Sequence, residues 1–102
     1  MVEHEQAQLL LQYYDTGDPE AVQQIIRDHV GLVIRFLDKC VHDQEIRIAM
    51  WRQTVHKLQI SRKHPELRFD MKLGTVTGFL MAIAGHLAYR WLVWHERPRP
   101  NW

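Results

Sequence analysis

The stretch FDMKLGTVTGFLMAIAGHLAYRWLVW, residues 69–94, decides the fold, because its apolar side chains recur at the spacing of a helix. On a helix with 3.6 residues per turn, these side chains gather on one side and the small and polar ones gather on another. The first side holds Val76, Phe79, Leu80, Ile83, Leu87, Trp91 and Trp94, and the second holds Thr75, Gly78, Ala82, Gly85, His86, Tyr89 and Arg90. We predict a two-faced helix that begins near Thr75 and ends near His95.

A membrane span is the main alternative for this stretch. A span needs about twenty nearly uncharged residues, whereas His86 and Arg90 fall inside this length. We therefore expect no membrane span. The small residues Gly78, Ala82 and Gly85 indicate close approach to the helix backbone by a neighbouring helix or by a nucleic-acid strand.

Three further helices precede this one. Residues 5–14 form a short amphipathic run, and a second helix begins at Asp18 and Pro19, which suit a cap and a first helical position. A third helix covers residues 43–58. The expected inward side chains are Leu9, Leu10 and Tyr13 in the first helix, Val22, Ile25, Ile26, Val30, Val33, Phe36 and Leu37 in the second, and Ile46, Met50, Trp51, Val55 and Leu58 in the third.

Length and composition limit the chain to one small domain. It has 102 residues, of which 46% are hydrophobic and 25% charged, as in globular proteins. We predict an all-α fold, a compact bundle of about four helices over residues 1–97, with residues 98–102 starting a linker or tail. The single cysteine, Cys40, and the absence of a signal-like opening point to the reducing cytoplasm.

Charge is divided unevenly along the chain. Residues 1–51 carry four basic and nine acidic side chains, a net −5, whereas residues 52–102 carry nine basic and three acidic ones, a net +6. Local rather than total charge attracts a polyanion. The second half is therefore suited to nucleic acid or an acidic partner, unless the division reflects two differently charged solvated faces.

A basic segment, residues 61–74, interrupts the helices. It contains a proline and reads as an exposed, positively charged loop, with Arg62, Lys63, His64, Arg68 and Lys72. Aromatic residues adjoin basic ones elsewhere, as in Trp51-Arg52 and Tyr89-Arg90-Trp91. Exposed aromatics beside cations are typical of proteins that hold single strands, although Trp51, Trp91 and Trp94 also fit a core.

Catalytic and metal-binding patterns do not emerge from the sequence. Among the seven histidines, His42, His56 and His64 lack the spacing of three or four that puts two on one helix face, and His86 and His95 are nine apart. No glycine-rich phosphate loop or nucleophile elbow is present. We expect no metal, no cofactor and no enzymatic activity.

Two blocks in order resemble region 2 of bacterial sigma factors of the extracytoplasmic-function type. The first block is LLQYYDTGDPEAVQQIIRDHVGLVIRFL, with a turn at Gly17, Asp18 and Ala21. The second is FDMKLGTVTGFLMAIAGHLAYRWL, whose matching positions are Phe69, Asp70, Gly74, Thr75, Phe79, Leu80, Ile83 and Ala84. The resemblance covers nearly the whole chain.

The resemblance implies a transcription-initiation domain with two partners. One face would bind the coiled-coil clamp of the largest subunit of core RNA polymerase, through Gln53 in one register or Gln44 and Glu45 in another, with Trp51 nearby. The other face would melt and recognise the −10 promoter element and hold the non-template strand. There the family's asparagine is replaced by His86, and Arg90 alone remains of the basic residues that follow it.

A second function remains open for the same shape. The chain departs from the family at the clamp-binding and base-reading positions while it keeps the apolar framework. A sigma-like protein-interaction module that binds an anti-sigma factor or another regulator would show the same departures. In the family a linker leads to a −35-binding domain, so the chain is either an excised domain or a sigma-like module with another use.

Overall fold

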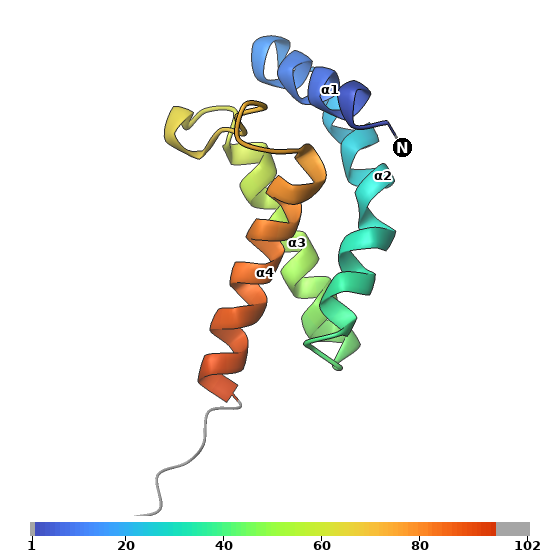
Figure 1. The fold of residues 1–102 in the computed structure, drawn as a ribbon, viewed down its shortest axis with the longest axis vertical. Helices are drawn as coiled ribbons and strands as arrows, with labels where there is room; N and C mark the ends of the chain where they lie inside the picture. The colour runs from blue at the N-terminus through green and yellow to red at the C-terminus, as the bar shows by residue number, and fades with distance from the viewer. Residues whose placement is uncertain (1, 96–102) are drawn as a thin grey trace, which may run out of the picture.

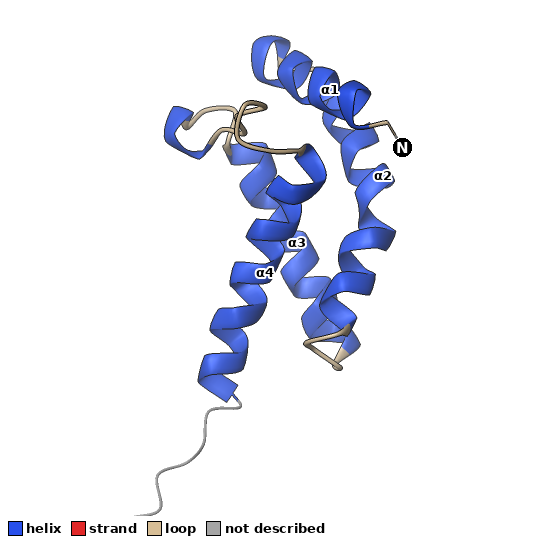
Figure 2. Cartoon of the chain, viewed as in Figure 1, coloured by secondary structure: helices blue, strands red, loops and turns tan. Residues whose placement is uncertain are grey.

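Four helices make up most of the computed structural model, which describes residues 2–95 (Figures 1 and 2). They are α1 (Glu3–Thr16), α2 (Pro19–Asp38), α3 (Gln44–Ile60) and α4 (Val76–His95), and a 3-10 turn, Pro65–Leu67, lies between α3 and α4. The described residues contain no strand. The predicted all-α bundle is confirmed, and each predicted helix begins within about two residues of the observed start. The predicted linker, residues 98–102, lies outside the described residues.

The turn between α1 and α2 depends on a glycine and a capping aspartate. Gly17 has φ 73°, a backbone conformation that favours glycine, and its N–H donates to the carbonyl of Tyr13 at 2.8 Å. The carboxylate of Asp18 then accepts the N–H of Glu20 at 3.0 Å. The chain therefore changes direction within two residues, and α1 lies across one end of α2 (Figure 1).

Side-chain caps also fix the starts of α3 and α4. The Asp43 carboxylate accepts the N–H of Glu45 at 2.9 Å, and the Thr75 hydroxyl accepts the N–H of Gly78 at 3.0 Å. Each cap satisfies a backbone donor that the first turn of a helix leaves without a partner. The predicted start of the last helix near Thr75 is confirmed.

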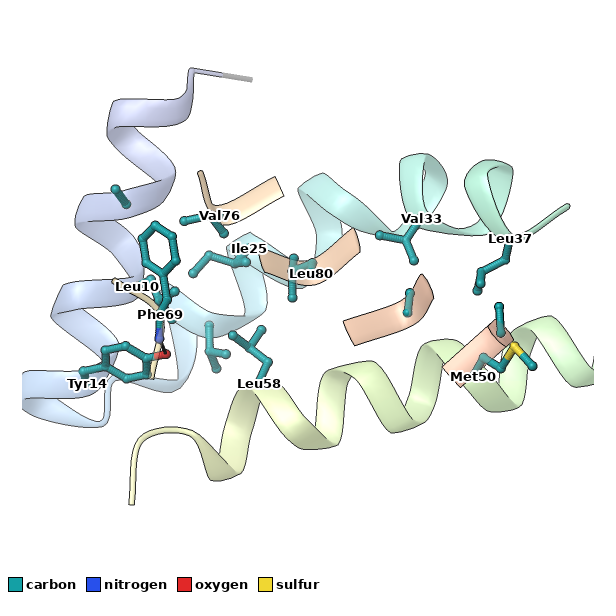
Figure 3. Packing of buried hydrophobic residues seen from close by; sticks show 14 of the residues in the cluster. Leu10, Tyr14, Ile25, Val33, Leu37, Met50, Leu58, Phe69, Val76 and Leu80 are labelled. Atoms are coloured by element: carbon teal, nitrogen blue, oxygen red, sulfur yellow. Dashed lines mark hydrogen bonds between the residues drawn. The ribbon is translucent and has the colours of Figure 1, made fainter. Parts of the chain in front are cut away.

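One apolar core joins the four helices (Figure 3). Leu10 of α1, Ile25 of α2, Leu58 of α3 and Leu80 of α4 are almost fully buried, and Phe69 reaches into the same core from the segment before α4. Helix α2 packs against the other three helices, and α1 packs against α2 and α4. The start of α4, and with it the end of the basic segment, is therefore fixed against both α1 and α2.

The predictions of which helix residues face the core are wrong in three places. Val30 is 38% exposed and Trp94 is 71% exposed, although both were expected to face inward. In α4 the fully buried positions are Val76, Leu80, Ala84 and Ala88, which shifts the buried side away from Trp94. A helix approaches the predicted stripe of small residues only at Gly85, where a Cβ would lie 3.5 Å from the ring of Phe36 in α2. Gly78 and Ala82 are exposed to solvent.

Candidate nucleic-acid interface

The basic segment, residues 61–74, is called the cationic loop here. Its beginning and its second half are tied to the end of α1. Tyr14 contacts the buried Ser61 hydroxyl at 2.8 Å, and the N–H of Phe69 donates to the Tyr14 hydroxyl at 3.0 Å. Ser61 and Phe69 are buried, so the expectation of an exposed loop is wrong at these two positions. The loop is therefore anchored in the core at Ser61 and at Phe69, and the residues that follow each of these anchors lie at the surface.

Two of the five basic side chains also hold the loop to the helices. The Arg62 Nε donates to the carbonyl of Tyr13 at 3.0 Å, and its guanidinium lies against Gly17, where a Cβ would come within 2.9 Å of Cζ. The Arg68 guanidinium donates to the carbonyl of Arg62 and lies 5.1 Å from the centre of the Tyr14 ring. These contacts hold both guanidinium groups in place. Arg62 is half-buried rather than exposed.

The remaining cations of the loop face solvent. Lys63 and Lys72 are exposed, and in the described part of the chain their ammonium groups have no hydrogen-bond or ion-pair partner. His64 is exposed too and lies 3.5 Å from the Glu66 carboxylate, an ion pair when the imidazole is protonated. Next to Lys72, Leu73 is 87% exposed. The loop therefore presents exposed lysine side chains, one of them beside an exposed apolar side chain.

A cleft of about 400 Å³ opens between the loop and the start of α4. A second one, of about 360 Å³, lies between the loop and the end of α3, and both clefts are lined by Arg68 and Phe79. The other lining residues of the first cleft are Phe69, Asp70, Leu73, Gly74, Thr75, Gly78 and Ala82. An aromatic ring and a guanidinium at the wall of an open cleft can stack on a planar ligand.

The first cleft continues along the exposed side of α4. Gly78, Ala82, His86 and Arg90 follow one another at intervals of four residues, and all four are exposed. Each is turned about 40° from the one before, so their path winds gradually round α4. Tyr89, next to Arg90, is 66% exposed. Two of the predicted contact residues, His86 and Arg90, thus lie on an exposed path that begins at the cleft.

The predicted polymerase-binding residues of α3 do not form one patch. Gln44, Glu45 and Gln53 are exposed, whereas Trp51 is half-buried and packs against the core. Gln44 and Gln53 are nine residues apart, and at about 100° per residue this places them on opposite sides of α3. The two registers considered for the clamp contact therefore use different surfaces.

Tyr13 is a further titratable group at this end of the bundle. Burial raises the pKa of the Tyr13 phenol, and the nearby Arg62 charge opposes that rise. The Tyr13 hydroxyl donates to the carbonyl of Gln59 at 3.1 Å. The phenol therefore stays protonated near neutral pH and acts as a donor to the end of α3.

Sequence reasoning missed the residues that hold the loop. Tyr14 contacts Ser61, 47 positions away along the chain, and the Glu3 carboxylate accepts the N–H of Val76, 73 positions away. The one visible signal was the Tyr13-Tyr14 pair at the end of a short amphipathic helix, where an aromatic hydroxyl needs a partner if it is buried.

The described residues hold no group of three or more histidine, cysteine, aspartate or glutamate side chains arranged to bind a metal ion. By length and composition alone, residues Val76–Trp94 of α4 would suffice to cross a membrane. No known protein family, curated protein or solved structure matches this chain.

Proposed function

We propose that this chain is a sigma-region-2-like domain that binds single-stranded promoter DNA of the −10 element and the clamp of core RNA polymerase in the cytoplasm. The observation that carries the proposal is the cleft between the cationic loop and α4. Arg68 and Phe79 line it, Lys72 lies beside it, and the exposed side of α4 extends it to His86 and Arg90. Cations along a path with stacking surfaces are how proteins hold a single strand.

Each part of this path has a separate role. Lys63 and Lys72 would contact phosphates, which fixes the position of a strand without reading its sequence. The cleft would accept an unstacked base between the Phe79 ring and the Arg68 guanidinium. His86 can both donate and accept a hydrogen bond, so it would contact a base edge or a sugar. In duplex DNA the bases are stacked and paired, so no base is free to enter the cleft.

Binding of fluorescent oligonucleotides to the full chain tests this proposal. A single strand with a −10-like, A/T-rich sequence should bind more tightly than the corresponding duplex. Its affinity should fall with salt at a slope of about −0.7 for each phosphate neutralised. Core polymerase should retain the chain in a pull-down. Absence of association with both the strand and the polymerase would remove the proposal.

One observation favours a second function, a module that binds a protein regulator such as an anti-sigma factor. Leu73, Met71 and Leu67 form exposed apolar positions in the loop, at 87%, 50% and 46% exposure, and the predicted clamp residues on α3 are dispersed. A pull-down that yields a small regulator and no polymerase subunit would favour this function over the first.

A further inference from the structure

Three hydroxyl and amide groups form a buried chain between α1 and the cationic loop. The Ser61 hydroxyl donates to the carbonyl of Leu58 at 2.6 Å, so its single proton is engaged there. The Tyr14 hydroxyl therefore donates to Ser61 Oγ, and its oxygen accepts the N–H of Phe69. Tyr14 joins the end of α3 to the second half of the loop, and both partners are buried.

The other end of α1 holds the point where the loop enters α4. One carboxylate oxygen of Glu3 accepts the N–H of Val76, the first residue of α4, and the other lies 3.4 Å from the Thr77 hydroxyl. A negative charge at this position is also favoured by the dipole of α4. Thr77 in turn lies 3.0 Å from Nε2 of His29, which is fully buried in α2.

The two contacts enclose the part of the loop that forms the first cleft. Residues 70–75 lie between Phe69 and Val76, the two positions that α1 holds through hydrogen bonds. Within this part of the loop, the backbone N–H groups of Lys72 and Leu73 both donate to Asp70. Asp70, Leu73, Gly74 and Thr75 line the cleft, and Lys72 lies among them.

We infer that α1 positions the cationic loop, with Tyr14 and Glu3 as positioning residues that set the shape of the cleft. This inference rests on the proposed function for its effect on strand binding, but its structural part stands without it. Loss of either contact lets residues 70–75 move while the apolar core of the four helices stays intact. Neither residue contacts the strand itself.

Two conservative substitutions with matched controls test the inference. Tyr14→Phe keeps the ring and removes the hydroxyl, and its control is Tyr13→Phe, which removes a bond to the Gln59 carbonyl of α3. Glu3→Gln removes the charge, and its control is Glu5→Gln, an exposed glutamate of the same first turn. A cooperative thermal transition shows which variants remain folded, and either pair suffices for the test.

Amide hydrogen exchange measures the position of the loop directly. Tyr14→Phe should raise the exchange rate of the Phe69 amide by about tenfold, the effect expected for one hydrogen bond. Glu3→Gln should likewise raise the exchange rate of the Val76 amide. The two controls should leave these amides unchanged. Equal exchange in Tyr14→Phe and Tyr13→Phe, or in Glu3→Gln and Glu5→Gln, would overturn the inference.

Strand affinity, measured on the same samples, separates the inference from the proposed function. Tyr14→Phe and Glu3→Gln should each weaken binding of the A/T-rich single strand by several-fold, while Tyr13→Phe and Glu5→Gln bind as the unchanged chain does. Faster exchange with unaltered affinity would overturn the link between α1 and strand binding. If the unchanged chain binds no strand, the proposed function fails, and the exchange rates still decide whether α1 positions the loop.

Discussion

The two halves of α4 are both rich in apolar side chains but have different surroundings. In the first half (residues 76–85), Val76, Leu80 and Ala84 are buried against the other helices, and Glu3 of α1 caps its start. The second half diverges from α2 and α3 (Figure 1), and Tyr89, Val93 and Trp94 are exposed there. The first half therefore supports the loop and the fold, and the second half presents a surface.

Truncating one apolar side chain in each half of α4 has the largest expected effect and tests whether the two halves are packed differently. Leu80→Ala should lower the free energy of unfolding by about 2–5 kcal/mol, because Leu80 is fully buried and the change leaves a cavity. Val93→Ala should change it by less than about 1 kcal/mol, because Val93 is 40% exposed. Urea denaturation measures both. Similar losses at the two positions would show that the second half is packed as tightly as the first.

Two glycines sharpen the contrast between the loop end and the rest of the bundle. Gly17→Ala should destabilise the fold by about 1–2 kcal/mol, because φ is positive and a Cβ would collide with the Arg62 guanidinium. Gly31→Ala in α2 meets nothing within 4 Å and should stabilise the helix by up to about 1 kcal/mol. Thermal melting shows the sign of each change, and two changes of the same sign would contradict the account.

Charge removal compares the loop with the second half of α4 as strand-binding surfaces. Single-strand binding weakens with salt, and its slope is that of the logarithm of the binding constant against the logarithm of the salt concentration. Lys63→Gln combined with Lys72→Gln should make this slope shallower by about 1.4, because two phosphate contacts are lost at about 0.7 each. Arg90→Gln should flatten it by about half as much. The control is Lys39→Gln, an exposed lysine just beyond α2. A slope that responds equally to Lys39 and to the loop lysines would remove the loop from the binding site.

The smallest expected effect concerns Asp28 of α2. Hydrogen bonds from the Gln24 amide, and then from the Gln6 amide of α1, lower the pKa of the Asp28 carboxyl from its ordinary 3.8. Because the folded pKa is the lower one, the carboxylate contributes stability above pH 3.8 that is lost as the pH falls through the folded pKa.

Thermal melting between neutral and acidic pH measures this contribution. The unchanged chain should lose more stability on acidification than Asp28→Asn, which has no carboxyl to protonate. Parallel pH profiles of the two proteins would show that Asp28 contributes nothing to the packing of α1 on α2.

Local signals predicted the helices well, because caps and turns act over a few residues. Asp18 with Pro19, Asp43 and Thr75 each begin a helix as expected. The apolar spacing of α2 also predicted which of its side chains face the core, with Val30 as an exception. The interior of α4 was harder, since its residues are apolar on nearly every side and only the extent of the neighbouring helices decides which are buried.

The candidate site was predictable in composition but not in geometry. The five basic residues of the loop are visible in the sequence, yet the guanidinium groups of Arg62 and Arg68 contact carbonyl groups, and that of Arg68 also lies over the Tyr14 ring. The Arg62 contact joins residues 49 positions apart, so no local pattern encodes it. The cleft at Phe79 likewise exists only once α3, the loop and α4 are packed together.

An NMR titration of the isotope-labelled chain with the A/T-rich single strand tests directly whether a strand binds at the cationic loop. Amide signals should shift in the cationic loop and along the exposed side of α4, at Gly78, Ala82 and His86. Signals of the exposed acidic residue Glu20 in α2 should stay in place. Shifts confined to α1 and α2, or an unchanged spectrum at a saturating strand concentration, would contradict a nucleic-acid site at the loop.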